Sequence, residues 1–168
     1  MDPARVELIV LDVDGVLTDG SIVVHADGVE SKTFHAADGV GIRAWLRLGF
    51  RIAVISGRRT PAVDRRLADL GVRDIIQGST DKARSIDELS HSTGVAPDVM
   101  AFVGDDWPDL PALRRVGYPI AVADAHERVR AASVYVTTRP GGRGAVREAI
   151  EHLLSARGSL DAAVALYD

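Results

Sequence analysis

The sequence predicts an α/β protein built on a doubly wound parallel sheet with helices on both faces. Short apolar runs rich in β-branched residues, such as Val6–Leu11, alternate along the chain with stretches of helical periodicity. Glycines such as Gly49 and Gly71 follow these stretches, at the position where glycine commonly ends a helix. Strands that alternate with helices form parallel βαβ units, which are typical of this fold class.

The predicted elements follow one another along the whole chain. The first strand is expected at Val6–Leu11, and a β-hairpin follows over about residues 21–34, with its turn at Ala26-Asp27-Gly28. From Gly39 to Gly49 the pattern becomes helical. The later elements are expected in this order: a strand at Arg51–Ile55, a helix from Thr60 to Gly71, a strand at Asp74–Ile76, a helix from Asp81 to Thr93, a strand at Val99–Val103, a helix at Asp109–Val116, strands at Ile120–Val122 and Val134–Thr137, and a helix from Gly144 to Ser155.

A single domain over residues 1–168 is expected, with a C-terminal tail from about residue 140. The stretches 15–55 and 57–81 are already filled by predicted elements, so neither can hold a cap domain of the ~50 residues that domains usually need. Within the tail, the glycine-rich segment Pro140–Gly144 predicts a flexible loop. A site at a bare sheet edge would be open to water, so a neighbouring subunit is expected to cover it.

Composition restricts the classes of function. The chain carries 20 Lys and Arg against 24 Asp and Glu, and this balance does not favour a nucleic-acid partner. It has no cysteine, which excludes disulfides and thiolate zinc sites. No apolar run approaches the ~20 residues that span a bilayer, and no secretory signal is recognisable near the N-terminus. A cytoplasmic protein without a membrane partner is expected.

Polar residues gather at the ends of the predicted strands. Asp12 and Asp14 follow the first strand, Ser56-Gly57-Arg58 and Asp105-Asp106 each follow a later one, and Lys82 lies at the start of the helix after a fourth. Taken alone, the two aspartates could belong to a solvated turn and Lys82 to the surface. The carboxyl ends of parallel strands, however, meet at one edge of the sheet, where ligands bind. The shared position therefore predicts one functional site.

These residue types suit phosphoryl transfer. Transfer to a carboxylate needs a nucleophile, an acid for the leaving oxygen and cations for the equatorial oxygens. Asp12, Asp14 and Asp105 form an oxygen-rich group of the kind that Mg²⁺ prefers, and the chain lacks the cysteines and clustered histidines of zinc sites. Lys82 offsets the negative charge and can bind a phosphate oxygen, while Ser56 and the Gly57 amide are compact donors.

Four segments resemble, in order, the motifs of the haloacid dehalogenase superfamily of phosphatases. They are Asp12-Val13-Asp14-Gly15-Val16, Ser56-Gly57-Arg58, Lys82 and Gly104-Asp105-Asp106-Trp107-Pro108-Asp109. Val16 stands where many members have Thr, and Trp107-Pro108 where relatives carry aliphatic residues. The resemblance implies the Rossmann-like fold of that superfamily and a magnesium-dependent reaction through an aspartyl-phosphate.

The family pattern implies a role for each matching residue. Asp12 would attack phosphorus, and Asp14 would protonate the leaving oxygen, activate water and bind metal through its main-chain carbonyl. Asp105 would be the third metal ligand. Ser56 and Lys82 would hold the phosphoryl group. Two further residues, Asp106 and Asp109, would orient either Lys82 or a metal-bound water, and the sequence does not distinguish these roles.

The match is closer to one branch of the superfamily, the 3-deoxy-D-manno-octulosonate 8-phosphate phosphatases of lipopolysaccharide precursor synthesis. The segments that resemble this branch are Asp12–Gly20, Asp38–Arg43, Ala121–His126 and Gly141–Glu148. A sister branch acts on nine-carbon sialic-type sugar phosphates and tends to have acidic residues where this chain has Arg58 and Arg143. Arginine is a good partner for a sugar carboxylate, so both positions favour the octulosonate substrate.

Two other classes of protein compete with a phosphatase. A phosphoacceptor receiver domain also combines acidic residues and Lys on a doubly wound sheet, but Ser56 follows the strand where its acceptor Asp is expected. A catalytically inactive binding subunit is disfavoured by the complete set of motifs.

The predicted hairpin suggests self-association. It carries the apolar residues Ile22, Val23, Val24, Val29 and Phe34, and a two-stranded hairpin alone is marginal in water. Pairing between copies would bury these side chains and satisfy the strand edges. Related phosphatases form tetramers around such hairpins. We therefore expect a homotetramer, in which the segment from Gly141 to Arg147 closes over bound substrate.

Overall fold

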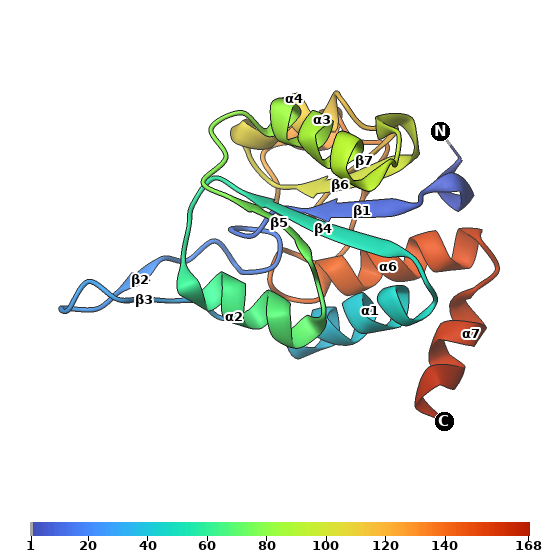
Figure 1. Cartoon of the computed structure of the whole chain (residues 1–168), viewed down its shortest axis with the longest axis horizontal. Coiled ribbons are helices and arrows are strands. Elements are labelled where there is room, and N and C mark those ends of the chain that lie inside the picture. The colour runs from blue at the N-terminus through green and yellow to red at the C-terminus, as the bar shows by residue number, and fades with distance from the viewer. Residues whose placement is uncertain (1) are drawn as a thin grey trace.

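In the computed structural model, which describes residues 2–168, six parallel strands form one sheet in the order β5-β4-β1-β6-β7-β8 (Figure 1). The chain runs outward from β1 through β4 and β5, returns, and then runs from β6 through β7 and β8 in the other direction. The switch between β1 and β6 is where open α/β sheets bind ligands. The strands are β1 (Leu8–Leu11), β4 (Arg51–Ser56), β5 (Asp74–Gln77), β6 (Met100–Gly104), β7 (Tyr118–Ala121) and β8 (Tyr135–Val136).

Helices cover both faces of the sheet, which confirms the predicted fold class (Figure 1). One face is covered by α1 (Ala36–Arg47), α2 (Pro61–Leu70) and α6 (Ala145–Ala156), the other by α3 (Lys82–Thr93) and α4 (Leu110–Leu113). Two shorter helices are α5 (Glu127–Ala131) and α7 (Leu160–Val164). The described residues also form the 3₁₀ turns η1 (Pro3–Arg5), η2 (Pro97–Val99), η3 (Trp107–Asp109) and η4 (Ala165–Tyr167).

The central strands are buried on both sides. Every residue of β1 and β6 is buried, and in β4 only Arg51 is exposed. Such strands read as continuous apolar runs because helices cover both faces of a parallel sheet. Leu11, the last residue of β1, lies opposite Val54 on one neighbour and Val103 on the other, so β4 ends two residues and β6 one residue beyond the end of β1. This register brings the residues that follow β1, β4 and β6 to one edge.

A β-hairpin projects from the body of the protein, as predicted, but its strands are short (Figure 1). β2 (Val23–Val24) and β3 (Glu30–Ser31) pair in antiparallel fashion, with two residues in each strand. The side chains of Ile22, Val23, Val24 and Val29 are between 49% and 62% exposed, whereas Phe34 packs against the core. Most of the apolar surface of the hairpin therefore faces solvent in one subunit.

The C-terminal part of the chain differs from the sequence prediction. Residues from about 140 were expected to begin with a flexible loop and to act as a tail. Instead, α6 packs against α1 and buries Val146, Ile150 and Leu153 completely or nearly so. Truncation before Pro140 would therefore remove part of the core. The helices α5 and α7 were not predicted, because five residues are too few to show a helical period.

Within residues 2–168, no helix has both the length and the apolar character that crossing a membrane would require.

Candidate active site

A cleft of about 820 Å³ opens at the carboxyl ends of β1, β4 and β6. It contains nine of the ten residues that the sequence singled out: Asp12, Asp14, Ser56, Gly57, Arg58, Lys82, Asp105, Asp106 and Asp109. The tenth, Arg143, does not line it. The cleft is also lined by Gly20, Ser79, Thr80, Asp81, Ala83, Pro108 and Pro111. The loops after three neighbouring strands thus meet as the parallel topology requires.

Lys82 lies at the centre of the site, between two carboxylates. Its Nζ is 2.8 Å from Asp12 Oδ1 and 2.5 Å from Asp109 Oδ1, and all three side chains are buried. Burial disfavours the charged form of Lys82, but Asp12 and Asp109 outweigh it and raise its pKa above the usual value. A charged lysine is therefore held beside Asp12, where it can bind an oxygen of an incoming phosphate.

Three carboxylates gather where a cation would fit. Oxygens of Asp12, Asp105 and Asp109 lie within 4.8 Å of one another. Burial raises the pKa of Asp12, and repulsion from Asp109 adds to the rise. The pKa of Asp105 is raised by burial and then by Asp12 and Asp109. Buried carboxylates that repel one another are stabilised by a divalent cation, and an all-oxygen donor set suits Mg²⁺.

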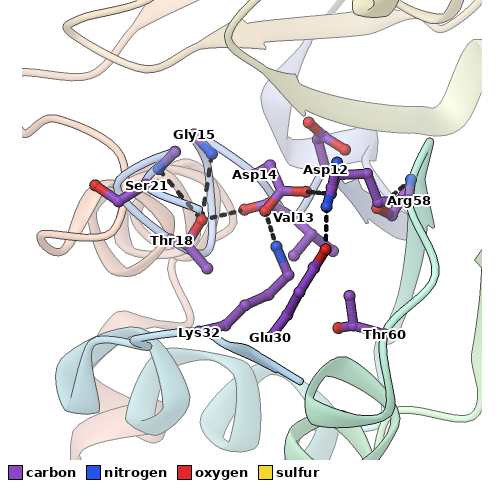
Figure 2. A network of polar contacts seen from close by, with 12 residues as sticks. Asp12, Val13, Asp14, Gly15, Thr18, Ser21, Glu30, Lys32, Arg58 and Thr60 are labelled. Carbon is purple, nitrogen blue, oxygen red and sulfur yellow. Dashed lines mark hydrogen bonds and ion pairs between the residues drawn. The ribbon is translucent and has the colours of Figure 1, made fainter. Parts of the chain in front are cut away.

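The Asp14 side chain is turned away from this group, toward the hairpin (Figure 2). Its Oδ1 forms an ion pair with Lys32, whose side chain is 2% exposed, and its Oδ2 is 3.9 Å from Nε of Arg58. Arg58 also donates to Glu30 Oε1 at 2.5 Å. The hairpin thereby places two charged groups at this side of the site, Lys32 beside Asp14 and Glu30 beside Arg58 (Figure 2).

The structure separates the two aspartates of the fourth motif. Asp109 contacts Lys82 and accepts a hydrogen bond from the Asp105 amide at 2.9 Å. Asp106 accepts from the Trp107 amide at 2.8 Å and so caps the 3₁₀ turn η3. Of the two aspartates whose roles the sequence left open, Asp109 is the one that contacts Lys82.

Ser56 ends β4 with a buried side chain. Its Oγ accepts a hydrogen bond from the Arg58 amide at 3.2 Å, and the Ser56 carbonyl accepts from the Ser79 amide at 3.0 Å. Gly57, between them, is exposed at the cleft. The turn is therefore fixed from both sides. The Ser56 hydroxyl and the Gly57 amide lie near the cleft, where they can donate hydrogen bonds to a phosphate.

Comparison with known proteins agrees with this geometry. A family profile described as haloacid dehalogenase-like hydrolase matches residues 68–150. The 3-deoxy-D-manno-octulosonate 8-phosphate phosphatase KdsC of Escherichia coli (strain K12) is 44% identical over 159 residues, which are 95% of this chain and 85% of that protein. The chain belongs to this family of phosphatases.

Solved structures of the family have the same fold. The Moraxella catarrhalis phosphatase, in complex with a magnesium ion, a phosphate ion and a KDO molecule, has a TM-score of 0.96 at 41% identity over 99% of this chain and 96% of that chain. The cobalt-bound enzyme of Haemophilus influenzae has a TM-score of 0.92 at 38% identity, covering 95% and 94% of the two chains. A divalent cation in these relatives agrees with the three-carboxylate group.

In this phosphatase, Arg143 stands apart from the other predicted residues. Its side chain is 67% exposed, and its guanidinium Nη2 is 3.6 Å from Asp19 Oδ2. The segment around it does not reach into the cleft of its own subunit. A contact of Arg143 with substrate therefore stays a prediction that a single subunit does not test.

Sequence reasoning missed three contributors to the phosphatase site. Glu30 lies in the short strand β3 and Lys32 follows that strand; neither belongs to a motif, so only the fold brings them to Arg58 and Asp14. Thr18 is buried, and its Oγ1 contacts the amides of Gly15 and Gly20 and the Val13 carbonyl at 3.3–3.4 Å. The one sequence feature that could have pointed to Thr18 is the presence of a small hydroxyl residue shortly after Asp-x-Asp-Gly.

Proposed function

We propose that this chain is a magnesium-dependent phosphatase that converts 3-deoxy-D-manno-octulosonate 8-phosphate to the free sugar acid and inorganic phosphate. The observation that carries the proposal is the cluster of Asp12, Lys82, Asp105 and Asp109, of which all but the half-buried Asp105 are buried, at the sheet edge of a member of this phosphatase family. The product would enter lipopolysaccharide precursor synthesis, as the resemblance of the sequence implies.

In the first half-reaction, an oxygen of Asp12 bonds to phosphorus while the bond from phosphorus to the sugar oxygen breaks. Asp14 gives its proton to the departing sugar oxygen. Lys82 sits 2.8 Å from Asp12, so it can hold a phosphoryl oxygen beside the nucleophile, and Ser56 and Gly57 offer further donors. Asp109 keeps Lys82 in place through its contact at 2.5 Å.

In the second half-reaction, Asp14 accepts a proton from water, whose oxygen then bonds to phosphorus as the bond to Asp12 breaks. Phosphate is released and Asp12 is restored. Asp12, Asp105 and the main-chain carbonyl of Asp14 would hold Mg²⁺, with Asp109 close enough to share the site. When bound, the ion offsets the charge of the carboxylates and of the phosphoryl group.

A substrate panel tests the proposal. Phosphate release from phosphorylated sugars should be fastest with the eight-carbon sugar acid, and a nine-carbon sialic-type sugar phosphate is the closest competitor to include. Chelation by EDTA should remove activity and added Mg²⁺ should restore it. Preference for the nine-carbon substrate, or full activity in excess chelator, would overturn the assignment.

The nucleophile is tested by Asp12→Asn, because an amide is a poor nucleophile and a poor metal ligand. We expect no measurable turnover with the fold intact, and for Asp14→Asn a loss of about 10²–10⁴-fold. Asp98→Asn, at an exposed position before β6, is the matched control and should keep full activity. Near-normal turnover of Asp12→Asn would refute the mechanism.

We infer that Arg58 binds the sugar acid part of the substrate and not its phosphate. It lines the cleft and is already paired with Glu30, which leaves part of its fork-shaped guanidinium near Asp14. Arg58→Ala should therefore reduce the specificity constant for the sugar phosphate more than that for para-nitrophenyl phosphate. Arg59→Ala, at an exposed neighbour outside the cleft lining, is the control. Equal losses of Arg58→Ala on both substrates would assign the arginine to the phosphate.

We further propose a homotetramer that associates through the hairpin and covers each cleft with a neighbouring subunit. The exposed apolar side chains of Ile22, Val23, Val24 and Val29 support it. Light scattering should show about four times the 17.9 kDa of one chain. Val24→Lys should reduce the mass, whereas Val164→Lys, at a valine on α7 that is also more than half exposed, should not. A fully active monomer would exclude this assembly.

Two expectations of the sequence analysis complete the proposal. We propose that residues 1–168 act as one domain, because α1 and α6, from distant parts of the chain, pack together under one sheet. A single cooperative unfolding transition by two probes would support this. A cytoplasmic location is also proposed, and cell fractionation would test it.

A further inference from the structure

The glycine-rich segment after β8 presses against the loop that follows the nucleophile. This catalytic loop, residues 14–19, turns back on itself through hydrogen bonds from the amides of Val16, Leu17 and Thr18 to the Val13 carbonyl at 3.0–3.3 Å. The Gly142 amide donates to the Val16 carbonyl at 2.9 Å. Two loops from opposite ends of the sequence thus share a main-chain hydrogen bond directly beyond Asp14.

Only glycine fits at this contact. A methyl group on Gly141 would overlap the Gly15 carbonyl and would lie 3.2 Å from the Val16 nitrogen. One on Gly142 would lie 2.9 Å from Thr18 Cα. In both cases the obstacle is backbone, which cannot rotate away as a flexible side chain can. The two main chains therefore touch at both ends of the catalytic loop, at Gly15 and Val16 and at Thr18 and Asp19.

The loop is enclosed from its other side by the metal-binding group. The position where Gly15 would carry a Cβ faces the Asp105 carboxylate, 3.0 Å from its Oδ1. The Gly15 peptide therefore lies between Asp105 and Gly141. The Asp14 carbonyl belongs to the peptide bond immediately before it, so a shift at Gly15 would be passed directly to that carbonyl.

Carboxylates from three different elements hold the segment in place. Glu148 accepts from the amides of Thr138 and Arg139 at 2.7 and 2.9 Å. Asp38, on α1, accepts from the Arg147 amide at 2.8 Å and from the Gly144 amide at 3.3 Å. Asp124 accepts from the Gly141 amide at 2.9 Å. These anchors make the segment a support rather than a movable flap.

We propose that Gly141 and Gly142 are positioning residues for the phosphatase reaction, which fix the main chain of residues 14–18 and thereby the geometry of the Mg²⁺ site. The inference deepens the proposed function and rests on it. It assigns the segment from Gly141 a role behind the catalytic loop of its own subunit, whereas the sequence suggested closure over substrate.

The decisive comparison uses two glycines with nearly the same positive φ. Gly142 and Gly158 have φ of +62° and +66°, and Gly158 has nothing within 4 Å of the position that a Cβ would take. Alanine therefore adds similar backbone strain at both positions but meets the catalytic loop at Gly142 alone. We expect Gly142→Ala to lower kcat by about 10²-fold, with little change in KM, and Gly158→Ala to keep kcat near the wild-type value.

Mg²⁺ binding gives a readout that is independent of turnover. Calorimetric titration with Mg²⁺ alone should show affinity about tenfold weaker for Gly142→Ala than for Gly158→Ala, because misplaced outer residues typically cost 10–100-fold. Equal kcat values and equal Mg²⁺ affinities for the two variants, both folded, would overturn the proposal.

A second pair of variants decides the case if Gly142→Ala does not fold. Asp124 is exposed and contacts the segment through the Gly141 amide. Asp124→Ala should lower kcat by about two- to tenfold, and Asp124→Asn, which keeps an acceptor oxygen, should restore most of it. If Asp124→Ala has full activity, or if Asp124→Asn is no better than Asp124→Ala, the proposal fails.

All variants are also assayed with para-nitrophenyl phosphate. A wild-type protein that cleaves this ester but not the sugar phosphate would refute the proposed substrate and leave the comparison among variants intact.

Discussion

The hairpin (residues 21–34) and the glycine-rich segment with the residues just before it (residues 138–144) both touch the catalytic loop, but they are attached to the protein in different ways. The hairpin has regular strands, but only two residue pairs join them, and its apolar side chains face solvent. The segment has no regular secondary structure, yet the carboxylates of Asp38, Asp124 and Glu148 accept hydrogen bonds from its amides. Attachment to the core, more than regular secondary structure, decides which part supports the site.

The largest expected difference between the two regions is in stability. Leu153 lies on the buried face of α6, directly after the segment, and Leu153→Ala should lower the free energy of unfolding by about 2–5 kcal/mol. Asp27→Ala, at the exposed tip of the hairpin, should change it by no more than about 0.5 kcal/mol. Urea denaturation measures both. Equal losses would mean that the hairpin is part of the cooperative core.

The hairpin should matter more for turnover than for stability. Lys32→Met removes the cationic partner of Asp14 but keeps the length of the buried side chain. The loss of this charge-assisted contact should lower kcat by about 10–100-fold. The control is His25→Ala, which loses a hydrogen bond to Ser31 within the same hairpin. Full activity of Lys32→Met would show that the hairpin contributes shape alone.

The hydrogen bonds that anchor the segment should contribute measurably to the stability of the protein. Glu148→Ala leaves the amides of Thr138 and Arg139 without their acceptor, at an expected cost of about 1–3 kcal/mol in unfolding free energy. Glu88→Ala, which breaks an exposed pair with Arg84 on α3, serves as the control and should cost less than about 0.5 kcal/mol. If the two losses are equal, Glu148 does not hold the segment.

The smallest effect concerns pH, and two anchors should respond in opposite directions. Burial raises the pKa of Asp38, and the amides of Arg147 and Gly144 and the charges of His35 and Arg139 offset this only in part. The pKa of Glu148 is lowered, because the donors of Thr138, Arg139 and Tyr135 outweigh its burial.

The signs follow from linkage. The contribution of Asp38 is fully present below its ordinary pKa of 3.8 and is lost as pH rises through the higher folded value. The contribution of Glu148 is present above its ordinary pKa of 4.5 and is lost as pH falls through the lower folded value. From pH 3 to 7, Asp38→Asn should therefore gain stability relative to wild type, and Glu148→Gln should lose it. Urea denaturation across this range would contradict the assignment if both variants moved in the same direction.

The sequence predicts most of the site because strand ends are easily recognised. Asp12, Ser56 and Asp105 each come directly after or at the end of an apolar run, and parallel pairing leaves such residues one place to meet. Lys32 could not be found in this way. It follows the short strand β3, and its contact with Asp14 depends on how the hairpin folds back.

The glycine-rich segment shows most clearly what local composition does not predict. Local composition describes the freedom that Gly141 and Gly142 would have in an isolated chain, and it correctly marks a departure from regular structure. It does not describe what surrounds them. Here the absence of side chains permits two backbones to touch, so the same residues that favour flexibility allow a tight contact.

The sequence by itself determined the order of strands and helices, the carboxylates and Lys82 of the site, and the family, because these depend on local patterns and on motifs at strand ends. The tertiary structure decided that Asp109 rather than Asp106 holds Lys82, that Lys32 pairs with Asp14, and that the segment from Gly141 lies behind the catalytic loop. Each of these contacts joins residues that are distant from one another in the sequence. Packing determines which residues meet, and local sequence patterns do not predict it.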